Sequence, residues 1–113
     1  MNSQNDDLSL EMYPYPASGV VGSRLGGEAV IVLPEQAKVK VLNEVGARIW
    51  ELADGSRSVA EIADQITREY QVDESEAHAD TRAFINTLLE RGLLRLSNQP
   101  FPSRAESAPG KGG

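Results

Sequence analysis

The sequence predicts an α+β fold in which a three-stranded antiparallel sheet is followed by three helices. Apolar residues first recur with the period of two expected of half-buried strands, and after residue 43 they recur at helical spacings of three and four. Turn and capping residues separate the segments. At 113 residues, with polar ends, the chain has room for one small hydrophobic core.

The first two strands are expected at residues 20–25 and 28–33. The Gly26-Gly27 pair between them suits a two-residue hairpin turn, because glycine accepts positive φ. After a short break, basic and apolar residues alternate over residues 38–42. This alternation is typical of a strand with one buried face, so the segment is the expected third strand.

The first helix is expected at residues 44–53, because Asn43 is a good N-cap and an Asp-Gly pair follows the last apolar residue. A second helix is expected to begin after Ser58 and to end near Tyr70. Ser58 and Glu61 fit a capping box, in which each side chain accepts a hydrogen bond from the other residue's backbone amide.

The third helix is expected at residues 74–91, between a repeated start signal at Asp73 and Glu76 and a natural C-terminal cap at Gly92. Its apolar stripe comprises Ala77, Thr81, Phe84, Ile85, Leu88 and Leu89. Residues 93–96 fit either a strand or an extended segment that closes the core.

The chain is expected to contain one folded domain, residues 18–97, between two polar ends. Residues 1–17 predict a flexible or extended lead-in, because alternate prolines in the Tyr-Pro-Tyr-Pro run forbid helix. Residues 98–113 are rich in Pro, Ser and Gly and cannot bury enough apolar area to offset chain entropy, so we expect a disordered tail.

Composition argues against several classes of function. The chain has no cysteine and one histidine, His78, which excludes disulfides, thiolate nucleophiles, iron–sulfur clusters and sulfur-ligated zinc. We therefore expect no metal site and no cofactor, and an exposed His78 without a role. Carboxylates fall mainly on helix faces and in caps, and no phosphate-binding glycine loop is present, so we expect no catalytic residues.

Charge and hydropathy restrict the location and the partners. The formal net charge of −6 opposes general attraction to nucleic acid. No stretch reaches the roughly 18 apolar residues that a membrane span needs, and the start lacks the order of a signal peptide. A cytoplasmic protein with no membrane partner is the expectation.

Residues 42–55, LNEVGARIWELADG, resemble the LNxxGxxIWxLxDG signature of PqqD-like proteins. Further matches lie at residues 59–62, 70–73 and 91–94, so the resemblance covers about residues 18–96. It implies a small winged-helix-like domain of the kind also called a RiPP recognition element. Such a module binds the leader segment of a ribosomally made precursor peptide. It presents that segment to a modifying enzyme such as a radical S-adenosylmethionine enzyme, or a lasso-peptide protease or cyclase.

The resemblance also implies where the peptide would bind. In the family the leader adds as a strand beside the third strand and packs against the third helix. An open strand edge offers main-chain hydrogen bonds to any peptide, and side chains entering a groove add selectivity. Here the corresponding residues are Lys38, Val39, Lys40, Val41 and Leu42 of the strand and Thr81, Phe84, Ile85 and Leu88 of the helix.

Within this set, Val39 and Val41 are expected to form one wall of the groove. Lys38 and Lys40 would meet acidic leader side chains at its rim, at about 1 kcal/mol or less for each exposed pair. A plainer interpretation stays open for both groups. Lysines on edge strands often prevent aggregation, and the apolar stripe of the third helix is mostly core.

Two other classes of function compete with peptide binding. The second and third helices fit a helix-turn-helix, which would make the chain a winged-helix DNA-binding regulator. Residues 73–92 carry five acidic and two basic residues, a net charge of −3, which phosphate would repel. A homodimer is the other alternative, because an unpaired edge strand can join two copies of itself.

Overall fold

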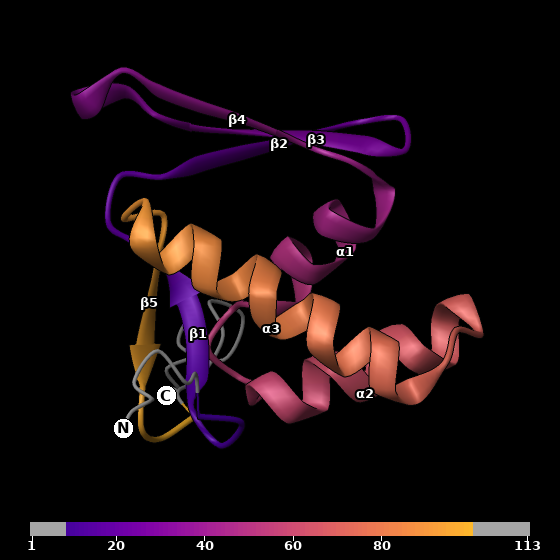
Figure 1. Ribbon diagram of the computed structural model, residues 1–113. Helices are drawn as coiled ribbons and strands as arrows, with labels where there is room; N and C mark the ends of the chain where they lie inside the picture. Colours follow the sequence, from indigo (N-terminus) through magenta and orange to yellow (C-terminus); the bar gives the residue numbers. More distant parts are fainter. Residues whose placement is uncertain (1–8, 101–113) are drawn as a thin grey trace, which may run out of the picture.

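A three-stranded sheet lies across a group of three helices, and a two-stranded ribbon flanks the helices at one side (Figure 1). The computed structural model describes residues 9–100. In chain order the elements are β1 (Tyr13–Pro16), β2 (Val21–Leu25), β3 (Glu28–Leu33), the 3-10 turn η1 (Pro34–Gln36), β4 (Lys38–Leu42), α1 (Glu44–Leu52), α2 (Val59–Tyr70), α3 (Glu74–Glu90) and β5 (Leu94–Ser97). The predicted α+β order of three strands and then three helices is confirmed.

The larger sheet has the strand order β2-β3-β4, and both pairs are antiparallel. Gly26 adopts φ +62° in the hairpin turn between β2 and β3, as its position in the sequence predicts. Ala29, Ile31 and Leu33 of β3 are buried against the helices, and the residues between them are not. The sheet therefore has an inner face on the core and an outer face turned away from it.

The N-terminal segment belongs to the fold over part of its length. We expected residues 1–17 to be a flexible or extended lead-in, but Tyr13–Pro16 pairs with β5 as an antiparallel strand. Pro14 lacks an N–H group and its carbonyl points away from β5, accepting a hydrogen bond from the Gly55 amide at 2.8 Å. The strand tolerates proline at alternate positions because only the backbone groups of the residues between the prolines form hydrogen bonds with the partner strand. Residues 1–8 and 101–113 lie outside the described residues.

The three helices begin at the caps that the sequence predicts. The Asn43 side chain accepts a hydrogen bond from the Gly46 amide, and the Asp73 side chain accepts one from the Glu76 amide. Ser58 and Glu61 form both hydrogen bonds of the capping box, at 3.1 and 2.8 Å. These contacts satisfy amides that the first turn of a helix leaves without partners.

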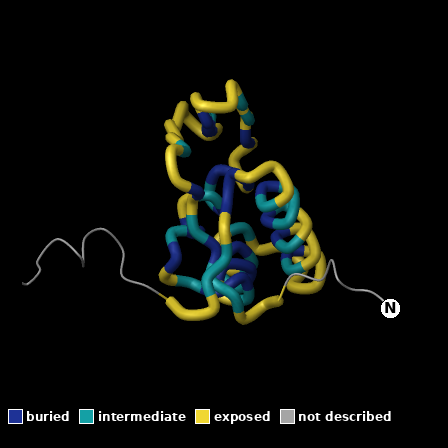
Figure 2. Tube along the Cα trace, turned by 90° about the vertical axis from the view of Figure 1, so that its left-hand side faces the viewer, coloured by how far each residue is buried: buried dark blue, intermediate teal, exposed yellow. Residues whose placement is uncertain are grey.

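One hydrophobic core joins the sheet to the helices. Its fully buried members include Ile31 of β3, Leu42 of β4, Ile62 of α2 and Ile85 of α3. Figure 2 shows the buried residues gathered in the body of the molecule, while much of the trace at the sheet end is exposed. Among the described residues, no helix is long and apolar enough to cross a membrane.

Paired ion contacts hold α1 against α2 at the surface. The Arg48 guanidinium donates two hydrogen bonds, both of 2.8 Å, to the carboxylate of Glu69. These bonds from Arg48, with a further one from Gln65, lower the pKa of Glu69 to about 2. Arg48 also contacts Glu51, which in turn pairs with Arg24 of β2. The network therefore links the sheet, α1 and α2.

Candidate functional site

A groove runs between β4, the start of α1 and α3. It encloses about 550 Å³ and is bordered by Lys40 and Leu42 of β4, by Val45 and Ile49 of α1, and by Phe84 of α3. β4 is the last strand of the sheet, and within the described residues no strand pairs with its outer edge. The groove therefore combines an open strand edge with apolar side chains from two helices.

The two sides of β4 face different surroundings. Lys40 pairs with the buried Ile31 in the antiparallel register, so its side chain is on the inner face together with those of Lys38 and Leu42. Val39 and Val41 are on the outer face, where they are 66% and 61% exposed. Val41 nevertheless borders the cavity and Val39 does not, so we correct the expectation of a groove wall for Val39 alone.

Lys38 is not among the residues that border the groove and instead contacts the end of α3. Its Nζ atom donates a hydrogen bond of 2.7 Å to the carbonyl oxygen of Arg91, at the C-terminal end of α3. A cation is favourable there, because helix carbonyls left without partners carry partial negative charge. Lys38 thus ties β4 to α3, and Lys40 is the β4 lysine that borders the cavity.

A glycine in α1 sets the distance between α1 and α3. A Cβ atom at Gly46 would lie 3.0 and 3.1 Å from two ring carbons of Phe84, closer than most such contacts. Glycine at this position of the LNxxGxxIW segment lets the Phe84 ring lie directly against the helix backbone. The Phe84 ring is half-buried and borders the groove, as the sequence analysis expected of this residue.

The other residues expected on α3 divide into two groups. Ile85 and Leu88 are both fully buried in the core, so they offer no surface to a ligand and are not part of the groove. Thr81 is 1% exposed and lines a second, smaller cavity. Sequence spacing places all four side chains near one helix face, but it does not decide which of them the core covers.

The smaller cavity adjoins the groove and is mostly apolar. It encloses about 120 Å³ where α1, the end of α2 and the start of α3 meet, and Val45, Ile49 and Asp80 border both cavities. Val45 and Val72 are 37% and 42% exposed at its border. The Oγ1 atom of Thr81 is buried there without a hydrogen-bond partner among the described residues.

Sequence reasoning missed this apolar pocket. Its lining comes from three elements, with Val45 in α1, Tyr70 at the end of α2 and Val72 in the following turn. No local signal in the sequence brings these residues together, because the pocket depends on how the helices pack.

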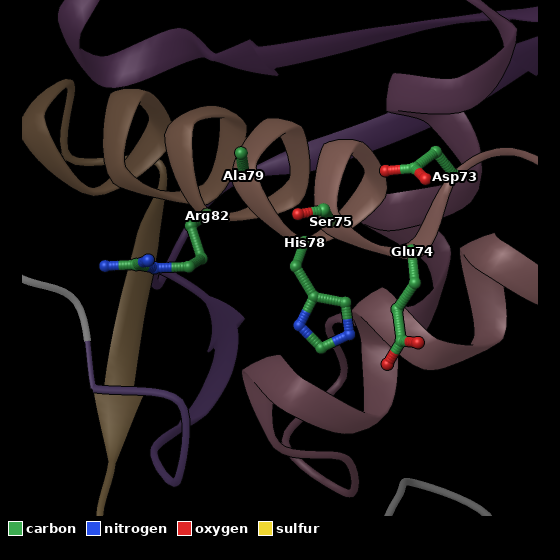
Figure 3. Close-up of a pocket in the computed structure, with 6 residues that line it drawn as sticks. All are labelled: Asp73, Glu74, Ser75, His78, Ala79 and Arg82. Carbon is green, nitrogen blue, oxygen red and sulfur yellow. The ribbon is translucent and has the colours of Figure 1, made fainter.

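A third hollow lies on the far side of α3 and is polar. It encloses about 630 Å³ and is lined by residues of α3 and its N-cap, which Figure 3 shows as sticks. His78 was expected to be exposed without a role, but its Nε2 atom lies 2.9 Å from a carboxylate oxygen of Asp64 on α2. Glu74 and His78 extend toward the same side of α3 (Figure 3), and their ligand atoms and that of Asp64 lie within 4.8 Å of one another.

This polar hollow is larger than the groove, but it is the weaker candidate. The His78–Asp64 contact already accounts for two of the three side chains as a hydrogen bond between helices. The hollow also lacks the apolar surface and the open strand edge that bind peptides. The groove beside β4 is therefore the candidate functional site.

Comparisons with known proteins identify the family of the chain. Residues 28–94, more than half of the chain, match the family described as coenzyme PQQ synthesis protein D (PqqD). The chain is 33% identical over 73 residues to the PqqA binding protein of Rhodopseudomonas palustris (strain BisB5), covering 65% of this chain and 70% of that protein.

Solved structures share the fold of the chain. TbiB1, determined in complex with the TbiA(beta) leader peptide, is 31% identical, with a TM-score of 0.66 over 72% of this chain and 94% of TbiB1. The PqqD part of Methylobacterium extorquens PqqCD, a RiPP recognition element, is 22% identical, with a TM-score of 0.66 over 80% of this chain and 96% of that one, which shows the shared fold. The chain belongs to the coenzyme PQQ synthesis protein D (PqqD) family.

Proposed function

We propose that this chain is a recognition module that binds the leader segment of a ribosomally made precursor peptide and presents it to a separate modifying enzyme. The observation that carries the proposal is the open edge of β4 beside the apolar groove. Support comes from relatives that are PqqA binding proteins and from TbiB1, which was solved with a leader peptide. We propose that the module acts without catalysis, in the cytoplasm, where ribosomal precursors are made.

The leader would bind as an added strand antiparallel or parallel to β4. Its backbone would form hydrogen bonds with the free edge of β4 whatever its sequence, which gives general affinity. Side chains at alternate positions would enter the groove between Lys40 and Phe84, which gives selectivity. Because Lys38 is bound to α3, the lysine available to an acidic leader residue is Lys40.

The apolar pocket beside the groove would hold one anchoring side chain of the leader. It lies directly beside the groove, because Val45, Ile49 and Asp80 border both cavities. Its apolar lining favours an aliphatic or aromatic side chain, which gains about 25 cal/mol for each Å² of apolar surface removed from water. A hydroxyl on that side chain would also satisfy the buried Oγ1 atom of Thr81.

The test is a titration of the ¹⁵N-labelled chain with synthetic leader peptides from precursor genes that neighbour its own gene. We expect saturable shifts confined to the amides of residues 40–42, the start of α1 and the Thr81–Phe84 turn of α3. Lys40→Glu should weaken the binding of an acidic leader about five- to tenfold, because it replaces attraction by repulsion at the groove.

The matched control is Arg95→Glu, the same kind of charge change at an exposed position of β5. It should leave the affinity unchanged. Shifts spread evenly over the surface, or equal losses in the two variants, would contradict a localised groove. Binding to duplex DNA that weakens with salt, with no response to any peptide, would favour the winged-helix regulator instead.

A further inference from the structure

Two carboxylates line the apolar pocket beside the groove without an ion pair. Glu76 and Asp80 lie four residues apart on α3 and both line the pocket, and Asp80 also borders the groove. Both residues are exposed, and no side chain of the described residues pairs with either carboxylate. The sequence has no basic residue three or four positions from either one, so two like charges are neighbours on the helix. A cation bound between them would relieve this repulsion.

The rest of the pocket is apolar except for one buried hydroxyl group. Its aliphatic and aromatic lining residues are Val45, Ile49, Ile66, Tyr70, Val72 and Ala77. Thr81 also lines it and is 1% exposed, and its Oγ1 atom has no hydrogen-bond partner among the described residues. A buried polar atom without a partner is uncommon in folded proteins. The pocket thus offers an apolar interior, a free hydrogen-bond acceptor and two carboxylates, and no basic residue lines it.

We infer that the leader side chain held in this pocket is a lysine. This inference rests on the proposed function and specifies the chemistry of the anchoring residue. The lysine stem supplies the aliphatic surface that the lining favours, and a long basic side chain can bury its stem while its charged end meets polar groups. The ammonium group has three donors, which suit the carboxylates of Glu76 and Asp80 and the Oγ1 atom of Thr81. An arginine matches less well, because its donors all lie in one plane.

The charges that border the groove also give the bound leader two different sides. Lys40 of β4 is the basic residue of the groove lining, and Asp80 of α3 is the acidic one. A leader added beside β4 lies between them, so its acidic residue would face the strand and its lysine would face the helix. This pattern differs from the general attraction of a basic peptide to a chain of net charge −6, which would favour a lysine at any position.

Calorimetric titration of the full chain with a leader peptide that shifts the groove amides tests the inference. Each lysine of the peptide is replaced in turn by norleucine, which keeps the aliphatic stem and lacks the ammonium group. We expect one position to stand out, with a five- to tenfold lower affinity. Asp80→Asn should weaken binding of the lysine peptide about fivefold and leave binding of the norleucine peptide at that position unchanged, because the two changes remove the same contact.

Two further variants separate this contact from general charge and from structural effects. Glu90→Gln makes a comparable charge change at an exposed position of α3 outside both cavities, and it should leave the affinity unchanged. Thr81→Val keeps the shape of the side chain and removes its hydroxyl group. It should weaken binding of the lysine peptide at least about twofold without lowering the stability of the chain, whereas a purely structural role would lower stability and affinity together.

Several outcomes would overturn the inference while the proposed function stands. These are equal losses at every lysine of the peptide, equal losses in Asp80→Asn and Glu90→Gln, or a leader without any lysine that binds tightly and shifts the same groove amides. A chain that binds no leader peptide at all overturns the proposed function itself, and the lysine anchor with it.

Discussion

Substitution of Gly22 by alanine tests how the sheet is seated on α1. Gly22 is in β2 on the inner face, opposite Ile31, and the indole of Trp50 lies directly against it. A Cβ atom there would be 2.6 Å from Nε1 of Trp50 and 3.3 Å from a methyl carbon of Ile31. β2 pairs with β3, and β3 pairs with β4, so this contact helps to seat the sheet that borders the groove.

The magnitude follows from the distances. Ordinary contact begins near 3.4 Å, so the indole must retreat by roughly 3.4 − 2.6 = 0.8 Å. Overpacking of this kind costs typically about 1–3 kcal/mol. Alanine regains about 0.5–1 kcal/mol, because glycine in a strand loses more backbone freedom on folding. We expect Gly22→Ala to lower the free energy of unfolding by about 1–2 kcal/mol.

Urea unfolding followed by fluorescence measures this change, because Trp50 is the one tryptophan in the chain and reports its own displacement. The native emission maximum should shift in Gly22→Ala, together with a lower urea midpoint. Gly27→Ala is the matched control, since a Cβ atom at Gly27 meets nothing within 4 Å. Equal stability and unchanged emission in Gly22→Ala would show that the indole does not lie against β2 and would refute the packing described.

Two further substitutions probe the polar groups of the helices. Thr81→Val should raise the free energy of unfolding by about 1 kcal/mol in the same urea assay, because it removes a buried hydroxyl without a partner; a loss of stability would reveal a partner. Glu69→Gln should cost less than about 1 kcal/mol at pH 7. The pKa of Glu69 is lowered from 4.5 to about 2 in the folded chain, so this contribution is present above pH 4.5 and is lost as the pH falls through 2. Urea midpoints of the variant and the unaltered chain should therefore converge near pH 2, and a constant difference would contradict the Arg48–Glu69 contact.

The sequence predicts the larger sheet and the helices well because their local signals are strong. Asn43, Ser58 and Asp73 cap the helices through hydrogen bonds to amides three residues away, and Gly26 turns the hairpin. These interactions involve neighbours in the chain and need no knowledge of the tertiary fold. Alternation on β4 likewise predicts a strand with two different faces.

β1 was missed because its stabilising partners are distant in the chain. The prolines give the Tyr-Pro-Tyr-Pro run weak strand propensity, and its hydrogen bonds run to β5 on one side and to the Gly55 amide on the other. Residues 93–96, which the sequence left open between a strand and an extended segment, overlap β5 (Leu94–Ser97), which forms through the same pairing. Neither segment forms a ribbon without the other.

The orientation of β4 could not be predicted for a similar reason. Lysines and valines alternate there, and hydropathy alone places the valines on the core side. The register with β3 does the opposite, because Ile31 and Leu33 fill the inner face and are paired with Lys40 and Lys38. Both lysines are therefore on the inner face, where Lys40 borders the groove and Nζ of Lys38 reaches the carbonyl oxygen of Arg91, as a long basic side chain can.

Because the lysines of β4 face inward and its valines face outward, β4 lies between two exposed apolar surfaces. Val45 and Val72 border the groove and its pocket, and Val39 and Val41 belong to the outer face, so β4 is the boundary between them. A peptide added beside β4 would alternate in the same way, with every second side chain in the groove and the others extending the outer face.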